Sequence, residues 1–120
     1  VNGDGNYSWD FTYIENVIQM NELAMKSQNE GAVNTIYNTA FGERNTLNDL
    51  IAYLKKYLSE FDSKIADVEI VYGENRIGDI PHSLASIDKA KNILGYNPKY
   101  SLQDGLKEAV SWYWDNLKEK

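Results

Sequence analysis

The clearest pattern in the chain is an apolar stripe over residues 47–58. Leucine or isoleucine recurs there at i, i+3, i+4, i+7 and i+11, which places these side chains along one face of an α-helix. Thr46 and Asp49 form a variant of the capping box, in which two side chains bond free backbone amides at a helix start. The pattern therefore predicts a helix that begins directly after Thr46.

Similar spacing predicts three further helices. A short one over residues 88–94 has Asp88 as its cap and stops at Gly95, a residue suited to the left-handed turn that follows many helices. Ser101, with an aspartate three residues later, opens the last helix. The remaining helix covers residues 14–26, and we expect its core-facing side to consist of Ile14, Val17, Ile18, Asn21 and Met25.

Strand-like patterns are shorter. Residues 10–13, 35–40 and 68–72 are rich in β-branched and aromatic side chains, and residues 3–5 (Gly-Asp-Gly) signal a simple turn. No repeat, low-complexity stretch or linker divides the sequence. We therefore predict one mixed α/β domain over residues 1–120, with more helix than strand.

Composition narrows the possible functions. The formal net charge is -6, which argues against nucleic-acid binding through phosphate neutralisation. There is no cysteine, and His82 is the single histidine, so we expect no disulfide, thiolate metal site or histidine metal cluster. No apolar run approaches the roughly 20 residues of a membrane span, and no signal peptide opens the chain. We therefore expect a cytoplasmic protein without a membrane or nucleic-acid partner.

The sequence contains no self-sufficient catalytic apparatus. A serine hydrolase of the Gly-x-Ser-x-Gly type is excluded because that motif is absent. None of the nine tyrosines has a lysine four residues later, so the Tyr-x-x-x-Lys pair that many oxidoreductases use is missing as well. Acidic residues such as Glu15, Asp49 and Asp104 fall on polar helix faces, where solvated charge is the simpler interpretation. We expect no catalytic, cofactor-binding or metal-binding residue in this chain.

Three stretches carry a resemblance to a known family. Residues 3–14 (Gly-Asp-Gly-Asn-Tyr-Ser-Trp-Asp-Phe-Thr-Tyr-Ile) are similar to Gly-Asp-Gly…Arg-Asp-Phe-x-Tyr-Val, and residues 37–42 (Tyr-Asn-Thr-Ala-Phe-Gly) to Tyr-Asn-x-Gly-x-Gly. Residues 76–98 are similar to Arg-x-Gly-Asp…Asp-x-x-Lys-Ala…Leu-Gly-Tyr/Trp-x-Pro, the most specific of the three. Together they resemble the extended short-chain dehydrogenase/reductase family that acts on nucleotide sugars, over almost the whole chain.

The resemblance implies an NAD-dependent UDP-sugar 4-epimerase of the UDP-glucose or UDP-N-acetylglucosamine type. In that family a Rossmann half holds NAD and the catalytic tyrosine and lysine, and the C-terminal part walls the nucleotide-diphosphate pocket. The chain, which begins without an initiator methionine, is then the C-terminal substrate-binding part with the Rossmann half missing. The resemblance further implies a UDP-sugar partner, NAD on the missing domain, a homodimeric parent protein and a fragment that is catalytically incompetent alone.

The resemblance also assigns binding residues. Arg76 falls where the family holds the pyrophosphate, and a guanidinium fork suits phosphate oxygens. Asp79 would accept hydrogen bonds from the ribose hydroxyls. Ser83 flanks the sugar, and a small residue there leaves room for an N-acetyl group, which implies that UDP-N-acetylglucosamine and UDP-N-acetylgalactosamine are accepted. Without the resemblance, Arg76 would be interpreted as a surface arginine and Asp79 as a turn residue.

Trp9 departs from the family pattern, which has an arginine there as a second pyrophosphate clamp. Tryptophan cannot supply that charge, although it offers an indole N–H and a stacking face. Two explanations stay open: the substrate binds more weakly or differently, or Trp9 stacks on the base or packs in the core. His82 and Asp10 are interpreted as residues that hold the binding residues in place and do not themselves bind the substrate.

Other functions remain alternatives at this point. A nucleotide-sugar dehydratase, decarboxylase or reductase of the same family would share the binding residues, because the residues that distinguish these reactions lie outside the chain. From a different class, the missing Tyr-x-x-x-Lys pair suggests a non-catalytic binding or interaction module as a further alternative. The small residue at Ser83 favours the epimerase.

Overall fold

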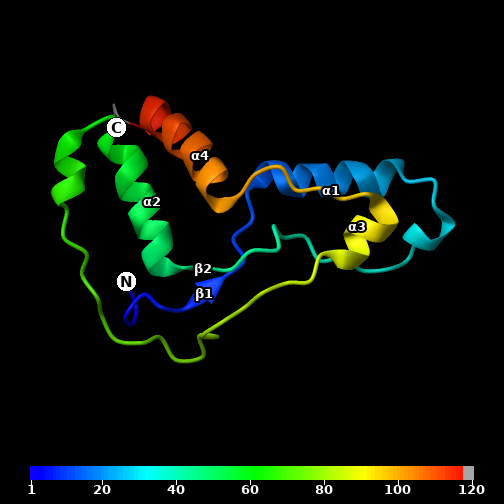
Figure 1. Ribbon diagram of the computed structural model, residues 1–120, viewed down its shortest axis with the longest axis horizontal. Helices are drawn as coiled ribbons and strands as arrows, with labels where there is room; N and C mark the ends of the chain where they lie inside the picture. The colour runs from blue at the N-terminus through cyan, green and yellow to red at the C-terminus, as the bar shows by residue number, and fades with distance from the viewer. Residues whose placement is uncertain (118–120) are drawn as a thin grey trace.

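The computed structural model describes residues 1–117, and its helices form two groups joined by a small sheet (Figure 1). One group contains α2, η2 and α4, and the other contains α1, η1 and α3. The sheet has two antiparallel strands, with Ser8 opposite Thr46 and Trp9 opposite Asn45. In chain order the elements are β1 (Ser8–Trp9), α1 (Ile14–Lys26), η1 (Glu30–Ala32), β2 (Asn45–Thr46), α2 (Leu47–Ser59), η2 (Ser63–Asp67), α3 (Asp88–Leu94) and α4 (Leu102–Leu117).

The four predicted helices are confirmed, and local chemistry explains their bounds. At the start of α2 the Asp49 amide donates to Thr46 Oγ1 (3.1 Å), and the Thr46 amide donates to Asp49 Oδ2 (2.8 Å), which is the reciprocal capping box. Gly95 ends α3 with a left-handed φ of 70°. One detail was wrong: Ile87, not Asp88, is the N-cap of α3, and no side chain caps that end.

The predicted inward face of α1 was wrong. Asn16 and Met20 are the buried residues of this helix, whereas Ile14 is 58% exposed and Met25 is 76% exposed. The reason is Asn16, whose side chain bonds the backbone at residues 99–100 and so turns its own side of the helix inward. A pattern of apolar spacing alone cannot weigh such a polar contact.

The predicted strands over residues 10–13, 35–40 and 68–72 were also wrong. The first lies one step beyond the observed β1, and the other two contain no strand. Ile36 is 84% exposed and Val71 is 76% exposed. A strand needs a neighbour for its backbone groups, and among residues 1–117 these segments pair with no other strand. An isolated bridge, Asn2 to Gly73, lies directly after the third segment.

The principal core is small and lies between α1, α3 and the turn near residue 40. It consists of Met20, Ala40, Ile87, Ala90, Leu94 and Tyr96. The Tyr96 hydroxyl donates to the Ala40 carbonyl (2.7 Å), so its polar end is satisfied inside the core. Burial, and then the nearby Asp10 carboxylate, raise the pKa of Tyr96 above its usual range.

The chain leaves an unusually large surface exposed. Its accessible area is 8405 Å², against about 6,600 Å² for a compact protein of this mass. Its radius of gyration is 17.3 Å, against about 13.6 Å for a compact domain of this length. The excess includes apolar side chains of α1 and α4: Ile14 borders an open cleft that Trp112 and Tyr113 also line.

We expect this apolar surface to drive self-association. The mean mass measured by light scattering should rise with protein concentration, and Ile18→Lys should reduce that rise because Ile18 is 43% exposed on α1. Asn21→Lys, at an exposed position of the same helix, adds the same single positive charge and is the matched control. A constant monomer mass over the whole range would contradict this expectation.

Candidate functional site

Three chain segments lie side by side around Ser8. On one side β1 pairs with β2, and on the other Ser8 forms a parallel bridge with His82. The Ser8 amide donates to the Pro81 carbonyl (2.8 Å), and the Ser83 amide donates to the Ser8 carbonyl (2.9 Å). The backbone thus holds Ser83 beside Ser8, the residue that precedes Trp9, although Ser83 and Trp9 are 74 positions apart in sequence.

A side-chain contact reinforces this pairing. Ser8 Oγ lies 2.8 Å from Nδ1 of His82. Ser8 is 2% exposed, whereas His82 is an exposed residue. The predicted supporting role of His82 therefore has a defined partner, which connects the loop of residues 76–83 to β1.

Arg76 and Asp79 form an ion pair in this loop. Nε and Nη2 of Arg76 each lie 2.9 Å from Oδ1 of Asp79. A turn at Gly78, whose φ is 89°, and a backbone bond from the Asp79 amide to the Arg76 carbonyl (3.4 Å) bring the two side chains together. The Arg76 side chain is 68% exposed and the Asp79 side chain 18%, so the guanidinium keeps donors that face solvent.

Trp9 stands in a row of aromatic rings. Its ring centroid is 6.3 Å from that of Tyr7 and 6.2 Å from that of Phe11, with edge-on geometry in both pairs. Alternate residues of an extended chain point to one side, which explains the row. Trp9 is half-buried. The structure therefore gives this residue packing contacts and also leaves part of the indole accessible to a ligand.

Asp10 holds a neighbouring turn. Its two carboxylate oxygens accept hydrogen bonds from the amides of Phe41 (3.0 Å) and Gly42 (2.8 Å). Gly42 has a φ of 90°, which favours glycine at this position. Asp10 therefore joins the end of β1 to the turn that precedes β2.

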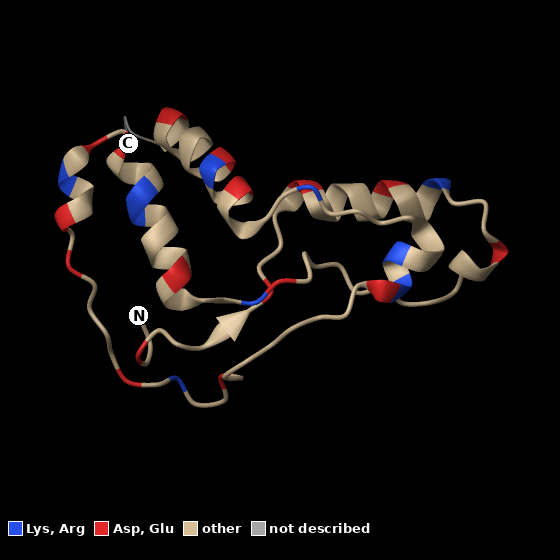
Figure 2. Cartoon of the chain, viewed as in Figure 1, with Lys and Arg blue, Asp and Glu red and all other residues tan. Residues whose placement is uncertain are grey.

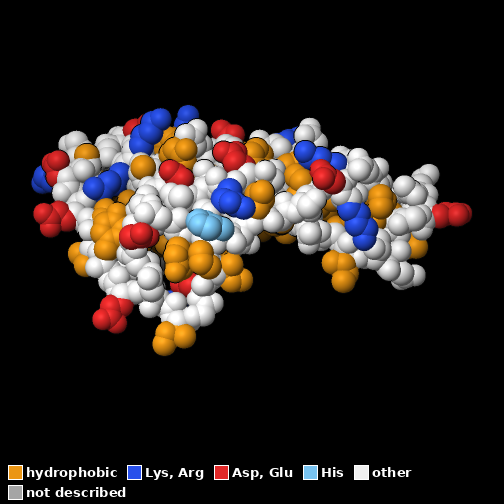
Figure 3. Space-filling view, turned by 60° about the horizontal axis from the view of Figure 1, so that its bottom comes forward, with side chains coloured by type: hydrophobic (Ala, Val, Ile, Leu, Met, Phe, Trp, Pro, Cys, Tyr) orange, Lys and Arg blue, Asp and Glu red, His pale blue; other side chains and the backbone are white. Residues whose placement is uncertain are grey.

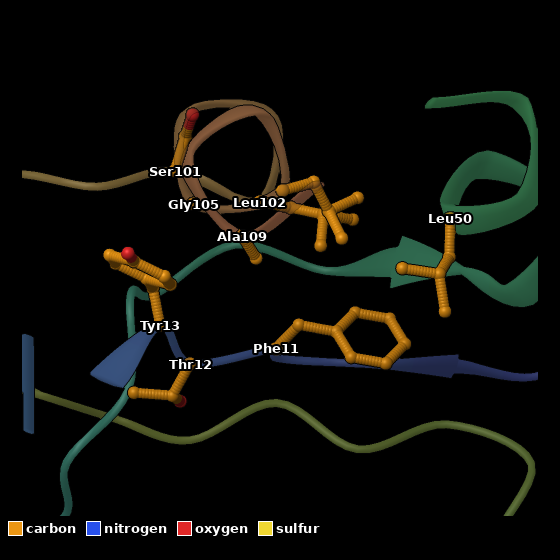
Figure 4. A pocket seen from close by; sticks show the side chains of 9 residues that line it. Phe11, Thr12, Tyr13, Leu50, Ser101, Leu102, Gly105 and Ala109 are labelled. Atoms are coloured by element: carbon orange, nitrogen blue, oxygen red, sulfur yellow. The ribbon is translucent and has the colours of Figure 1, made fainter. Parts of the chain in front are cut away.

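An apolar cleft adjoins the row of aromatic rings at Phe11. It has a volume of about 210 Å³ and lies between residues 11–13, α2 and the start of α4 (Figure 4). A more polar cleft of about 380 Å³ includes residues 84–88 and so adjoins Ser83 in sequence. Within residues 1–117, the Arg76–Asp79 pair makes no hydrogen bond to Trp9 or Ser83. The structure thus groups the predicted binding residues into two sets, Arg76 with Asp79 and Trp9 with Ser83. They do not line one closed pocket.

Sequence reasoning missed two polar residues that shape this region. Ser8 links the two segments of the site, and Asn16 is 1% exposed and bonds the loop before α4. Each of them contacts a residue more than 70 positions away in the sequence, so local sequence patterns gave no signal for these partners.

Residues 1–117 show neither a metal-ligand cluster nor a membrane-spanning helix, and their charges are mixed. These residues contain no group of three or more metal-ligating side chains. In the same part of the chain, no helix combines the length and apolar character of a membrane span. Acidic and basic residues are interspersed along both groups of helices (Figure 2).

Known proteins share this fold over nearly its whole extent. The UDP-glucose 4-epimerase of Thermotoga maritima, solved with UDP-glucose, matches 98% of this chain with a TM-score of 0.82 and 35% sequence identity. The UDP-N-acetylglucosamine 4-epimerase of Methanobrevibacter ruminantium, solved with UDP-N-acetylmuramic acid, matches 98% with a TM-score of 0.82 and 29% identity. In sequence, the UDP-glucuronate 4-epimerase of Thermodesulfobacterium geofontis is 29% identical over 96% of the chain.

The relatives of this chain are UDP-sugar 4-epimerases of the extended short-chain dehydrogenase/reductase type. The matches cover 35% and 34% of the two solved epimerases and 33% of the Thermodesulfobacterium epimerase. The chain thus spans about a third of the length of these epimerases. No protein-family model matches it.

Proposed function

We propose that this chain is the nucleotide-sugar-binding portion of an NAD-dependent UDP-sugar 4-epimerase. The observation that carries the proposal is the Arg76–Asp79 pair on a loop that is bonded to β1 through Ser8. A guanidinium with free donors can bind diphosphate oxygens in a bidentate manner, and an adjacent carboxylate can accept hydrogen bonds from ribose hydroxyls. The Thermotoga relative, solved with UDP-glucose, supports this ligand class.

We further propose that the sugar is an N-acetylated hexosamine. Ser83 is exposed and its backbone is fixed beside Ser8, so a small side chain borders the space available to a sugar. The Methanobrevibacter relative is a UDP-N-acetylglucosamine 4-epimerase solved with another N-acetylated sugar nucleotide. The proposal places the parent protein in the cytoplasm as a homodimer.

The described residues do not fit a dinucleotide cofactor. A phosphate-binding glycine loop needs open space at its glycines. At Gly3 and Gly5 a Cβ would collide with the side chains of Asn75 and Asn48, so that space is already filled. A more distant epimerase from Bacillus cereus was solved with NAD. In our proposal NAD and the reacting groups belong to a part of the enzyme outside this chain, which alone binds the substrate without converting it.

Arg76→Ala should weaken UDP binding by roughly 10- to 100-fold, because a charge-assisted, bidentate contact contributes about 1.5–3 kcal/mol. Isothermal titration with UDP and with UDP-N-acetylglucosamine measures the effect. Lys64→Ala is the control, since it removes the same charge from an exposed position of η2. Unchanged UDP affinity in Arg76→Ala, with Lys64→Ala also unchanged, would overturn the proposed role of the loop.

A further inference from the structure

The contact between Ser8 and His82 determines which ring nitrogen carries the proton. Ser8 is 2% exposed, and its hydroxyl lies 2.8 Å from Nδ1 of His82. In the part of the chain that the structure describes, this hydroxyl has no other hydrogen-bond partner. A buried hydroxyl proton needs an acceptor, because an unsatisfied polar group costs about 1–3 kcal/mol.

The hydroxyl proton therefore goes to Nδ1. If Nδ1 carried a proton itself, it would donate to Ser8 Oγ, and the serine proton would then have no acceptor. The neutral ring with its proton on Nε2 satisfies both groups at once. Nδ1 and Nε2 flank Cε1 and their outward directions diverge widely, so this N–H points away from Ser8.

The free N–H belongs to an exposed side chain. His82 is exposed, and Figure 3 shows the histidine at the surface, next to a basic side chain and a group of hydrophobic side chains. Ser83 follows directly in the chain, and the Arg76–Asp79 pair precedes it on the same loop. Ser8 thus fixes a neutral donor in the middle of the segment that carries the proposed binding residues.

We propose that His82 is a ligand-binding residue whose Nε2–H donates to a diphosphate oxygen of the nucleotide sugar, and that Ser8 is the positioning residue that sets its tautomer. The identity of the ligand in this inference rests on the proposed function. The inference adds a second binding group beside Arg76. A fixed neutral donor keeps its direction without a flexible stem, unlike a lysine.

The single histidine allows a direct test by nuclear magnetic resonance. Long-range proton–nitrogen spectra of the imidazole should show the Nε2–H tautomer in the unmodified chain, and addition of UDP should shift its Nε2 signal. In Ser8→Ala the ring should become a mixture of tautomers, because the directing hydroxyl is gone. Uridine, which lacks phosphates, should leave the Nε2 signal in place.

Binding measurements complete the test. His82→Asn keeps an acceptor at the position of Nδ1 for Ser8 but has no Nε2, so it should fold normally and bind UDP about tenfold more weakly. Equal UDP affinity in His82→Asn, while Arg76→Ala still loses affinity, would overturn this inference and leave the proposed function intact. A chain that binds no UDP at all would overturn both.

Discussion

Replacing Asn16 with alanine should lower the free energy of unfolding by about 3 kcal/mol. Asn16 is 1% exposed and makes three hydrogen bonds to the loop before α4. Its Nδ2 donates to the Tyr100 carbonyl (2.7 Å), and its Oδ1 accepts from the amides of Lys99 (3.1 Å) and Tyr100 (3.2 Å). Alanine leaves these three backbone groups without their partner.

Urea unfolding followed by circular dichroism measures this loss. Gln19→Ala is the matched control, because Gln19 lies on the same helix and its Oε1 accepts one bond from the Asn97 amide (2.9 Å). That variant should cost about 1 kcal/mol or less, since its partner is exposed and water can replace the bond. If both variants unfold at the same urea concentration, the role given to Asn16 is wrong.

Replacing Gly105 with valine should destabilise the chain by about 3 kcal/mol, through overpacking. Gly105 is buried on α4, and a Cβ there would lie 2.8 Å from Cβ and Cγ of Tyr13. These atoms are at the base of the tyrosine, so a rotation of the ring cannot relieve the collision. The Tyr13 ring also packs on Tyr100, with centroids 5.0 Å apart.

Thermal unfolding tests the prediction, and a loss of this size should lower Tm by roughly 10 °C or more. Lys107→Val, at an exposed position of the same helix, isolates the effect of valine on helix propensity, which is about 0.5 kcal/mol. The Tm of Gly105→Ala should fall between those of the two valine variants, so this variant still tests the prediction if Gly105→Val does not fold. Equal Tm values for Gly105→Val and Lys107→Val would refute the collision.

Helices were predictable from the sequence because their determinants are local. The Thr46–Asp49 capping box and the left-handed Gly95 act within a few residues and appear in the structure as expected. The strands were not predictable, because residues 35–40 and 68–72 have the composition of strands but lack neighbouring strands among residues 1–117. Amino-acid composition shows that a segment prefers an extended conformation, whereas a hydrogen-bonded strand also requires a second segment beside it.

The candidate site was predictable in part. The arginine and aspartate are three positions apart across a glycine, so their proximity follows from a tight turn at Gly78. The contact of Ser8 with His82 spans 74 positions, and only the folded backbone reveals it. The binding roles of Arg76, Asp79, Ser83 and Trp9 came from the family resemblance and remain predictions, the first of which the Arg76→Ala titration tests.

The large exposed surface of the folded chain has a thermodynamic consequence. With 8405 Å² still accessible, folding buries roughly 58% of the surface of the unfolded chain, a fraction typical of a domain of about 60 residues. The urea dependence of stability and the heat capacity of unfolding both scale with newly exposed area. Unfolding exposes about 11,500 Å² in this chain, against about 13,300 Å² for a compact protein of the same mass. Both quantities should therefore be roughly one-seventh smaller than for a compact domain of this length.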